Sequence, residues 1–388
     1  MALNSCLNTR PKGIDIMQRW IGWAVLALAL YAFYLFVRPA EDPPLLQEKQ
    51  EAVPKEKAEP QPVAAESSEE TSGVTSSLKL GAVLDCTFGE NCWIARYSDR
   101  DRSKGKADYQ CGRRTQNNHK GTDFAVANLG EMKRGVAVLA AAEGTVLRTR
   151  DSMQDISVQQ TGRKAVKGKE CGNAVVIEHV DGLTTQYCHM KMGSVDVAPG
   201  AKVKRGQQIG QLGLSGDTEY PHMHLNVRRD GKRIDPFDGQ PLDVSCSAGG
   251  STSTDQKSMW TDSPTYQAMD LLPLVFSDKP LTRQSRWEEP QGAILKDAPA
   301  LILTGIAWNV LEGDEWEFTI VRPDGSRATN QALTTKQNRQ SQWYANRLFP
   351  PKNGFMKGTW TGKLVVTRAR TDGAPLRFES ETTVLVTE

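Results

Sequence analysis

An uncharged run of eighteen residues, 20–37, constrains this chain more than any other sequence feature. At about 1.5 Å per residue it would form about 27 Å of helix, close to the thickness of a bilayer core. Basic residues precede the run and acidic residues follow it, so the positive-inside tendency puts the N-terminus in the cytoplasm. We therefore expect a cytoplasmic tail (1–19) and a single-pass inner-membrane anchor (20–37), with the rest of the chain in the periplasm.

A cleaved signal peptide is the alternative to an anchor. Such a signal needs small residues at its exit, whereas Arg38 and Pro39 stand there, which favours an uncleaved segment. Met17 is a second candidate start codon, and the sequence leaves that choice open.

Residues 38–77 have the composition of a tether. From Pro39 to Ser77 there are six prolines and nine acidic residues, and no aromatic residue. Such a stretch cannot bury enough apolar surface to order itself, so we expect a disordered linker.

Six of the seven cysteines fall between residues 78 and 250, which predicts disulfides in an oxidising compartment. Fifteen connectivities are open. Cys86 and Cys92 are close enough in sequence to form one pair. Cys171 and Cys188 are expected to bond elsewhere, because the hairpin register considered below leaves them about 13 Å out of step.

Short β-branched runs separated by glycine predict a mainly β fold after residue 78. Strand-like runs occupy 144–150, 173–180, 183–190 and 224–234, and we expect this folded unit to cover 78–247. Asp181-Gly182 predicts a hairpin; as a two-residue turn it would pair Glu178 with Thr185 and Ala174 with His189.

A second unit is predicted at 265–388, after a polar linker at 248–264. Its strand-like runs are ALILTGIAW (300–308), EWEFTIVRPDGS (315–326), QSQWYANRL (340–348), TWTGKLVVTRAR (359–370) and LRFESETTVLVT (376–387). These runs and the Asp-Gly turns between them are typical of an immunoglobulin-like β-sandwich. It contains no histidine, so we interpret it as a binding or packing module.

Only five histidines occur in the chain, and most of them lie in informative contexts. His119 and Asp123 are four apart in a loop that enters a strand, so both side chains can converge from a bend. His222 and His224 are two apart, and a strand places both on one face. One of the pair would bind a metal while the other stands beside the bound water. His179 is interpreted as an ordinary surface or packing histidine.

Two histidines and one aspartate with an open fourth position describe a catalytic zinc site, since structural zinc sites are closed by four protein ligands. The metal would polarise a carbonyl and acidify a bound water. Cys188 is discounted as a fourth ligand, because it adjoins His189 and strand neighbours face opposite sides.

These segments resemble the catalytic domain of the lysostaphin-like zinc metallopeptidases, which cut peptide cross-bridges in bacterial peptidoglycan. The matched segments are HKGTD (119–123), GNAVVIEH (172–179), TTQYCHM (184–190), PGAKVKRGQQIGQLG (199–213) and HMHLNVRRDGKRIDP (222–236). The resemblance implies an antiparallel sheet of the duplicated hybrid motif type. Two segments, 137–146 and 199–210, agree with it, because each reads as strand, turn and strand with glycine at the corners.

The resemblance also assigns roles to residues. It implies one Zn²⁺ held by His119, Asp123 and His224, with His189 and His222 as the catalytic histidines. These two would orient or deprotonate the attacking water and stabilise the oxyanion. Asn173 falls at a family position near the substrate groove; the alternative for it is a turn residue.

Three other readings stay open. The Met190-Lys191-Met192 triplet is found in biotinyl and lipoyl carriers, but a carrier would not require the histidines and aspartate. A catalytically inactive adaptor that binds peptidoglycan or activates another cell-wall hydrolase is the second reading. The third concerns 151–170, which would be either a lid over the groove or a plain solvated loop.

The sequence thus predicts a membrane-anchored zinc metalloendopeptidase that acts on peptidoglycan. The inner membrane is its partner through the N-terminal helix, and the C-terminal domain would contact the cell-wall machinery. The 48 basic and 46 acidic residues nearly balance, which excludes the strong field of a nucleic-acid binder.

Overall fold

The computed structural model describes residues 78–246, 258–371 and 373–388, all within one compact unit. The predicted tail, anchor and linker, which together cover residues 1–77, lie outside these residues. Within the described ranges, no helix is both long and apolar enough to cross a membrane. Strands dominate these ranges, which confirms the predicted mainly β fold class.

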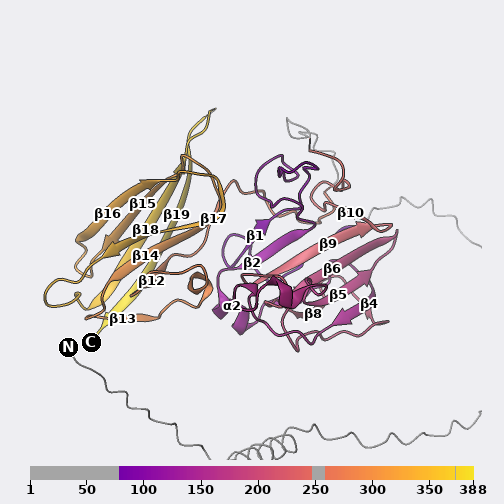
Figure 1. Cartoon of the computed structure of the whole chain (residues 1–388), viewed down its shortest axis with the longest axis horizontal. Helices are drawn as coiled ribbons and strands as arrows, with labels where there is room; N and C mark the ends of the chain where they lie inside the picture. The colour runs from indigo at the N-terminus through magenta and orange to yellow at the C-terminus, as the bar shows by residue number, and fades with distance from the viewer. Residues whose placement is uncertain (1–77, 247–257, 372) are drawn as a thin grey trace, which may run out of the picture. The chain divides into compact units, whose positions relative to one another are not determined.

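The first folded part is built mostly of short strands. They are β1 (Cys92–Arg96), β2 (Thr122–Val126), β3 (Ala137–Leu139), β4 (Gly144–Arg150), β5 (Asn173–Glu178), β6 (Leu183–Met190), β7 (Lys202–Val203), β8 (Gln208–Gln211), β9 (His222–Arg229) and β10 (Lys232–Ile234). The helical segments are α2 (Leu129–Arg134), α3 (Val158–Thr161) and the 3-10 turn η1 (Arg163–Val166). Eight strands form one antiparallel sheet in the order β1-β2-β9-β6-β5-β4-β7, with β10 beside β9 (Figure 1). β3 and β8 pair separately.

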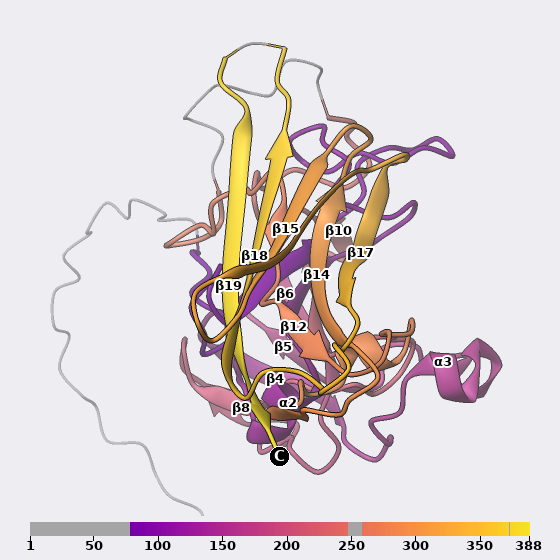
Figure 2. The same ribbon diagram turned by 90° about the vertical axis from the view of Figure 1, so that its left-hand side faces the viewer.

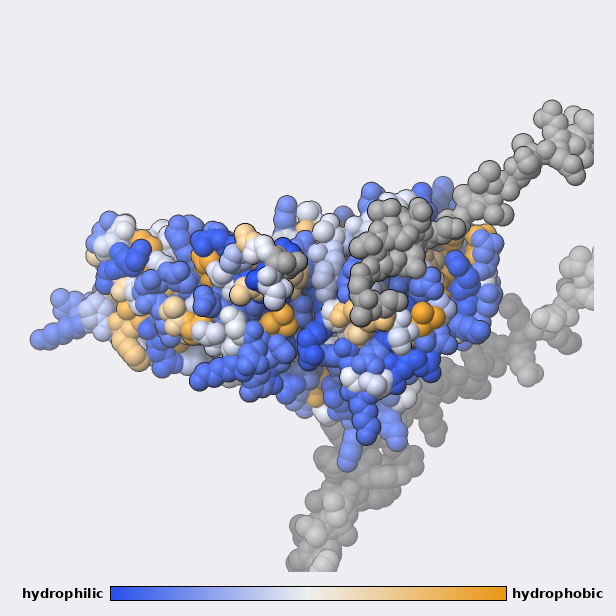
Figure 3. All heavy atoms as spheres, turned by 90° about the horizontal axis from the view of Figure 1, so that it is seen from above, coloured by the Kyte–Doolittle hydropathy of each residue, from blue (hydrophilic) through white to orange (hydrophobic). Residues whose placement is uncertain are grey.

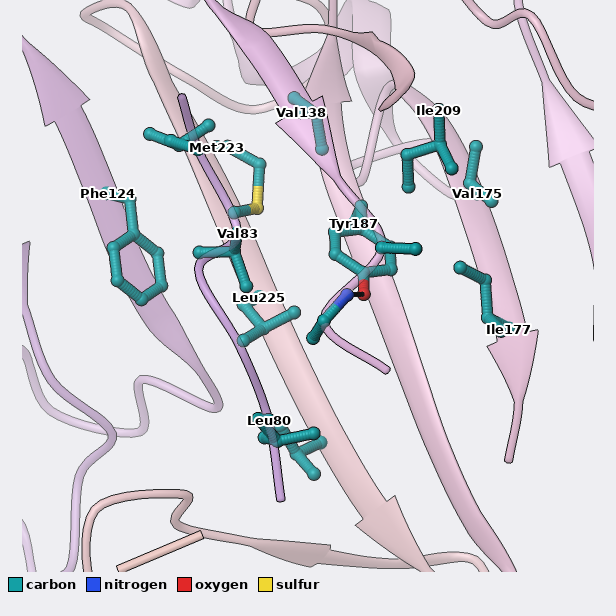
Figure 4. Packing of buried hydrophobic residues seen from close by; sticks show 14 of the residues in the cluster. Leu80, Val83, Phe124, Val138, Val175, Ile177, Tyr187, Ile209, Met223 and Leu225 are labelled. Atoms are coloured by element: carbon teal, nitrogen blue, oxygen red, sulfur yellow. Dashed lines mark hydrogen bonds between the residues drawn. The ribbon is translucent and has the colours of Figure 1, made fainter. Parts of the chain in front are cut away.

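Alternation along the central strands sends apolar side chains to one face of this sheet. Phe124 of β2, Met223 and Leu225 of β9 and Tyr187 of β6 are fully buried there (Figure 4). The Tyr187 hydroxyl accepts a hydrogen bond from the Ala141 N–H at 2.7 Å. Burial of each such side chain stabilises the fold by about 1.5–3 kcal/mol, so this face anchors the sheet.

The predicted hairpin joins β5 and β6, which pair antiparallel. Its predicted register is wrong by one residue, because Glu178 lies opposite Thr184 rather than Thr185. The turn has three residues, 180–182, instead of two, and Asp181 adopts a positive φ of 57° within it.

Residues 258–261 pack into the first folded part, although the sequence places them in a linker (248–264). The Leu80 N–H donates a hydrogen bond to the Met259 carbonyl at 2.6 Å, and the Leu80 carbonyl accepts one from the Thr261 N–H at 2.8 Å. Trp260 is buried against Phe124, with ring centroids 6.1 Å apart. The chain therefore returns to the sheet, because burying the large apolar area of the indole is favourable.

The second folded part consists of two sheets. Its elements are β11 (Asp270–Leu271), β12 (Val275–Ser277), η2 (Ser285–Trp287), β13 (Ala293–Leu295), β14 (Leu301–Val310), β15 (Glu315–Val321), β16 (Arg327–Thr334), β17 (Arg339–Leu348), β18 (Gly358–Arg368) and β19 (Leu376–Thr387). One sheet has the order β11-β14-β12 with β17 beside β14, and the other has the order β13-β19-β18-β15-β16 (Figure 2). Leu303, Trp316, Phe318 and Leu364 belong to one fully buried cluster drawn from both sheets. We call this part the C-terminal sandwich.

A separate apolar cluster joins the two folded parts. It combines side chains of the first part with side chains of the C-terminal sandwich, namely Trp93, Ala95, Ala125, Tyr220, Leu272, Trp287, Ile306 and Trp308. Nearby, the buried Arg114 forms an ion pair with Asp270 and donates to the Gln267 carbonyl at 2.8 Å. The interface is therefore desolvated, and its buried arginine is paired with a carboxylate, which offsets the cost of burying the charge.

The outer surface differs from these cores. On the face seen in Figure 3, hydrophilic side chains dominate the described residues, and apolar ones are scattered. Single exposed apolar side chains of this kind are normal for a soluble surface. On this face, the described surface is therefore mainly polar.

Candidate metal centre and active-site cleft

Strand pairing brings three of the predicted site residues to one face of the large sheet. In the antiparallel pair of β2 and β9, Asp123 lies opposite His224 and Ala125 lies opposite His222. Phe124 points to the apolar face, so the residues on either side of it point the other way. The alternation that builds the core thus also gathers these polar side chains.

His119 reaches the same place from the loop before β2. Its Nδ1–H donates to the Tyr97 carbonyl at 2.8 Å, which directs Nε2 towards Asp123 Oδ1 at 3.1 Å. A Cβ on Gly121 would lie 2.3 Å from the Leu225 carbonyl oxygen and 2.5 Å from His224 Nε2. Glycine is needed there, because any side chain would displace the strand that carries the site.

His119, Asp123 and His224 form a donor set for a metal ion. One ligand atom from each lies within 4.8 Å of the other two, and His224 Nδ1 is 2.7 Å from Asp123 Oδ1. Imidazole nitrogen and carboxylate oxygen are the donors of catalytic zinc sites. The hydrogen bond from His119 to a backbone carbonyl also fixes its tautomer, as is usual for metal-binding histidines. The residues present therefore fit one zinc ion.

His189 and His222 lie beside this donor set, with ring centroids 4.7 Å apart. His189 Nδ1–H donates to the Ser215 carbonyl at 2.7 Å, and His222 Nδ1–H donates to the Tyr220 carbonyl at 2.9 Å. Nε2 of each neutral ring is then the acceptor nitrogen. His222 Nε2 faces the donor set, 3.5 Å from Asp123 Oδ1.

Burial sets the protonation of these groups. It lowers the pKa of His189 well below 6.5 and the pKa of His222 to about 4, so both imidazoles are neutral at pH 7. Burial alone would raise the pKa of Asp123, but His119 and His222, with hydrogen bonds from His119 and His224, hold it well below 3.8. The site therefore combines an ionised carboxylate with neutral imidazoles that can accept protons.

A cleft of about 800 Å³ opens over these five side chains. Along β9, the loop before His222 contributes Asp217 and Glu219 to one part of the cleft wall. Arg228 and Arg233 line the part beyond His224. The side chains are therefore accessible to a ligand of peptide size.

Residues 117–236 match the sequence profile of peptidase family M23. Residues 117–236 are an M23 peptidase domain. The predicted resemblance to the lysostaphin-like family is thereby confirmed, and the metal donors, His189 and His222 all lie within this M23 domain.

Curated relatives match about three tenths of the chain. Stage II sporulation protein Q of Bacillus subtilis is 33% identical over 109 residues, 27% of this chain and 38% of that protein. Peptidoglycan DD-endopeptidase ShyA of Vibrio cholerae is 32% identical over 116 residues, 30% of this chain and 21% of that protein. The chain thus spans between about a fifth and two fifths of the length of these relatives.

A solved structure, the catalytic domain of lysostaphin from Staphylococcus simulans, is 23% identical to the chain. The match covers 31% of this chain and 77% of that chain, with a TM-score of 0.23.

Two residues that contact Asp123 were not predicted from the sequence. Arg96 at the end of β1 places a guanidinium nitrogen 3.6 Å from Asp123 Oδ2. The Tyr220 hydroxyl donates to the same oxygen at 3.3 Å, and its ring stacks on His222 at 4.5 Å. Tyr220 lies two residues before His222, and this spacing could have predicted that the two side chains share a face. No such pattern in the sequence identifies Arg96.

Tyr220 also connects the site to the C-terminal sandwich. Its ring packs against Trp287 and Trp308, with centroids 5.3 and 5.0 Å away. The two carboxylate oxygens of Glu219, beside it, accept hydrogen bonds from Arg283 Nη2 at 2.7 and 2.8 Å. One wall of the cleft is therefore supported by residues outside the M23 domain.

Asn173, which the resemblance places near the substrate groove, is the first residue of β5. Its side chain is fully buried and is not among the residues that line the cleft. Its amide accepts from the Met153 N–H at 2.8 Å and donates to the carbonyls of Met153 and Met190. Because both polar atoms of its side chain bond to backbone groups, Asn173 holds the loop before β5 in place.

The segment 151–170 is predicted to be either a lid or a solvated loop, and most of its residues after Val158 are exposed. It contains α3 and η1, and Val158 and Val166 are buried. Arg163 of this segment lines the cleft and forms an ion pair with Asp217 at 3.0 Å. The segment therefore makes part of the cleft wall.

The cysteines partly follow the prediction. Cys86 and Cys92 are bonded, as expected. Cys171 and Cys188 are bonded too, with Cα atoms 4.8 Å apart, so the expectation that they bond elsewhere is wrong. The pairing of β5 and β6 is irregular between Asn173 and Val175, which brings the chain before β5 alongside β6. The third disulfide joins Cys111 to Cys246.

The remaining histidine is a packing residue. His179 is buried, with Nδ1–H donating to the Glu143 carbonyl at 2.7 Å and Nε2 bonded to Thr185 Oγ1 at 2.8 Å. It is not among the residues that line the cleft.

Proposed function

We propose that this protein is a zinc-dependent endopeptidase that hydrolyses peptide cross-links of bacterial peptidoglycan. The observation that carries the proposal is the convergence of His119, Asp123 and His224 with two neutral histidines in an open cleft. The M23 domain supports a peptidase, and the curated relatives include a peptidoglycan DD-endopeptidase.

The bound zinc would supply Lewis acidity, which polarises a substrate carbonyl and lowers the pKa of water. His189 or His222 accepts the proton of the attacking water at Nε2, since Nδ1 of each ring is held by a carbonyl. The same imidazolium then returns that proton to the departing amine, so one water is consumed for each peptide bond. Arg96 adds positive charge beside Asp123, which favours the negative charge of the tetrahedral intermediate.

The location is part of the proposal. Residues 20–37 would anchor the protein in the inner membrane, and residues 38–77 would let the M23 domain reach the wall from the periplasmic side. We also propose that the C-terminal sandwich is immunoglobulin-like and contacts the cell-wall machinery. Its packing against Tyr220 gives it a second role, the support of the cleft wall.

Digestion of peptidoglycan sacculi tests the function. The full chain should release soluble fragments cut at a peptide bond, as mass spectrometry would show. A chelator should stop the release, zinc should restore it, and His119→Ala should abolish it. His179→Gln is the matched control, because it changes a buried histidine away from the cleft.

Two outcomes would count against the proposal. Release that persists in the chelator or in His119→Ala would remove the metal from the mechanism. A chain that releases nothing but accelerates a second cell-wall hydrolase would be an adaptor and not an endopeptidase.

A further inference from the structure

The part of the cleft beyond His224 has a chemistry that the proposed hydrolysis does not use. Asn226 and Arg228 follow His224 at alternate positions on β9, and therefore lie on its face. Gln186 of β6 lies opposite Asn226, and Arg233 of β10 lies opposite Arg228. All of these residues line the same cleft as the metal donors.

Among the described residues, neither of these two arginines forms an ion pair with a carboxylate. They are cross-strand neighbours, an arrangement that destabilises a sheet when both residues carry the same charge. Arg228 donates to the Gln186 amide oxygen at 3.0 Å, a neutral partner. Burial, with Arg233 and Arg148 nearby, lowers the pKa of Arg228. The chain thus maintains an unfavourable pair of positive charges inside its cleft.

Arginines elsewhere in the cleft show the opposite arrangement. Arg163 is paired with Asp217 at 3.0 Å, and Arg283 is paired with Glu219 at 2.7 Å. Those charges are internally compensated. The cleft therefore does not leave its arginines unpaired as a rule, and the unpaired charges of Arg228 and Arg233 need a separate explanation.

A second observation at the same place points to a ligand. Asn226 is only 8% exposed, yet its Oδ1 atom is buried without a hydrogen-bond partner among the described residues. A buried amide oxygen left unpaired costs about 1–3 kcal/mol. It lies between the metal donors and the arginines along β9, where an N–H group of a bound peptide would satisfy it.

We propose that Asn226, Arg228 and Arg233 form a subsite for a carboxylate-bearing peptide. The two guanidinium groups bind the carboxylate, and the Asn226 amide oxygen accepts a backbone N–H of the same peptide. His224 and Arg228 are four residues apart, about 13 Å along a strand, so the carboxylate lies within about four residues of the reacting bond. This inference rests on the proposed function only for the identity of the peptide.

Binding without turnover tests the subsite. The full chain carrying His189→Ala and loaded with zinc is titrated with a peptidoglycan stem peptide, either with free carboxylates or fully amidated. The free acid should bind at least about 10-fold more tightly than the amide. Arg228→Gln should remove that preference, because it should weaken the binding of the free acid and leave the binding of the amidated peptide unchanged. Arg327→Gln, at an exposed position of β16 in the C-terminal sandwich, is the matched control and should change either Kd less than about twofold.

The outcomes separate this inference from the proposed function. Equal binding of acid and amide, or an unchanged preference in both Arg228→Gln and Arg233→Gln, would overturn the subsite. The zinc affinity of each variant, measured against a chromophoric chelator, verifies that its cleft is folded. If sacculi are not cut but the acid preference depends on Arg228, the endopeptidase proposal fails while the subsite stands.

Discussion

The two faces of the large sheet are made by the same strands, but one face packs in the core and the other lines the cleft. On one face of β9, Met223, Leu225 and Val227 are buried in the apolar core. On the other face, His222 and His224 meet Asp123 in the cleft. Along β9, alternate residues therefore contribute to the stability of the fold, and the residues between them form the candidate metal centre. The comparison teaches that a function-destroying change and a fold-destroying change can be one position apart.

The sharpest test of this separation is His224→Ala. Loss of one of three metal donors should reduce zinc affinity by more than about 100-fold, since even partners outside the ligand shell contribute about 10–100-fold. The release of fragments from sacculi should disappear. The free energy of unfolding without metal should stay within about 1 kcal/mol of the unmodified protein, because His224 is part of no apolar cluster. Competition with a chromophoric chelator and urea unfolding measure the two quantities.

The adjacent change, Leu225→Ala, should do the reverse. Removing a buried leucine leaves a cavity, so the free energy of unfolding should fall by about 2–5 kcal/mol. Zinc affinity should remain within about threefold of the unmodified protein at temperatures where the variant is folded. A variant that keeps its stability but loses zinc would show that the two faces are not independent.

Asp235 is a carboxyl group that is fully buried in the first folded part. Burial, with Asp238 nearby, raises the pKa of Asp235 from 3.8 to about 7. The folded protein holds this proton up to about pH 7, whereas the unfolded chain releases it near pH 4, so unfolding in that range releases a proton. Titration of Asp235 therefore lowers the free energy of unfolding as pH rises from about 4 to 7.

Asp235→Asn keeps the shape and removes the titration. Its free energy of unfolding should match that of the unmodified protein near pH 4 and exceed it at pH 8, as urea unfolding at several pH values would show. A difference between the two proteins that does not vary with pH would mean that Asp235 is ionised throughout.

The smallest expected effect is that of Tyr220→Phe. The variant keeps the ring between His222 and the sandwich but loses the hydrogen bond to Asp123 Oδ2. Zinc affinity and the rate of release should each fall by about 10-fold, near the lower end for partners of metal ligands. Tyr266→Phe removes a similar hydrogen bond, to Asp108 at 2.9 Å, and should leave zinc affinity unchanged. Equal effects of the two variants would argue for a general loss of stability.

Local pattern predicted much of this arrangement. Alternation in HMHLNV placed His222 and His224 on one face, and the strand runs at 144–150 and 183–190 coincide with β4 and β6. Such features depend on nearest neighbours along the chain, which a sequence displays directly. The mainly β fold and the M23 resemblance followed from the same segments.

What the sequence did not predict depends on contacts between distant segments. Arg96 reaches Asp123 only because β1 pairs with β2, and Tyr220 meets Trp308 only across the interface with the sandwich. The Cys171–Cys188 bond was missed because a three-residue turn and an irregular strand pairing altered the expected register. Turn length and strand irregularity are set by packing, which a single sequence encodes weakly.

His119, Asp123 and His224 are expected to hold one metal ion whose remaining position faces the cleft. Anomalous diffraction at the zinc edge from crystals of the zinc-loaded protein tests this arrangement directly. We expect a single strong peak within bonding distance of these three side chains, with no fourth protein ligand. Absence of the peak, or an ion closed off by four protein ligands, would contradict it.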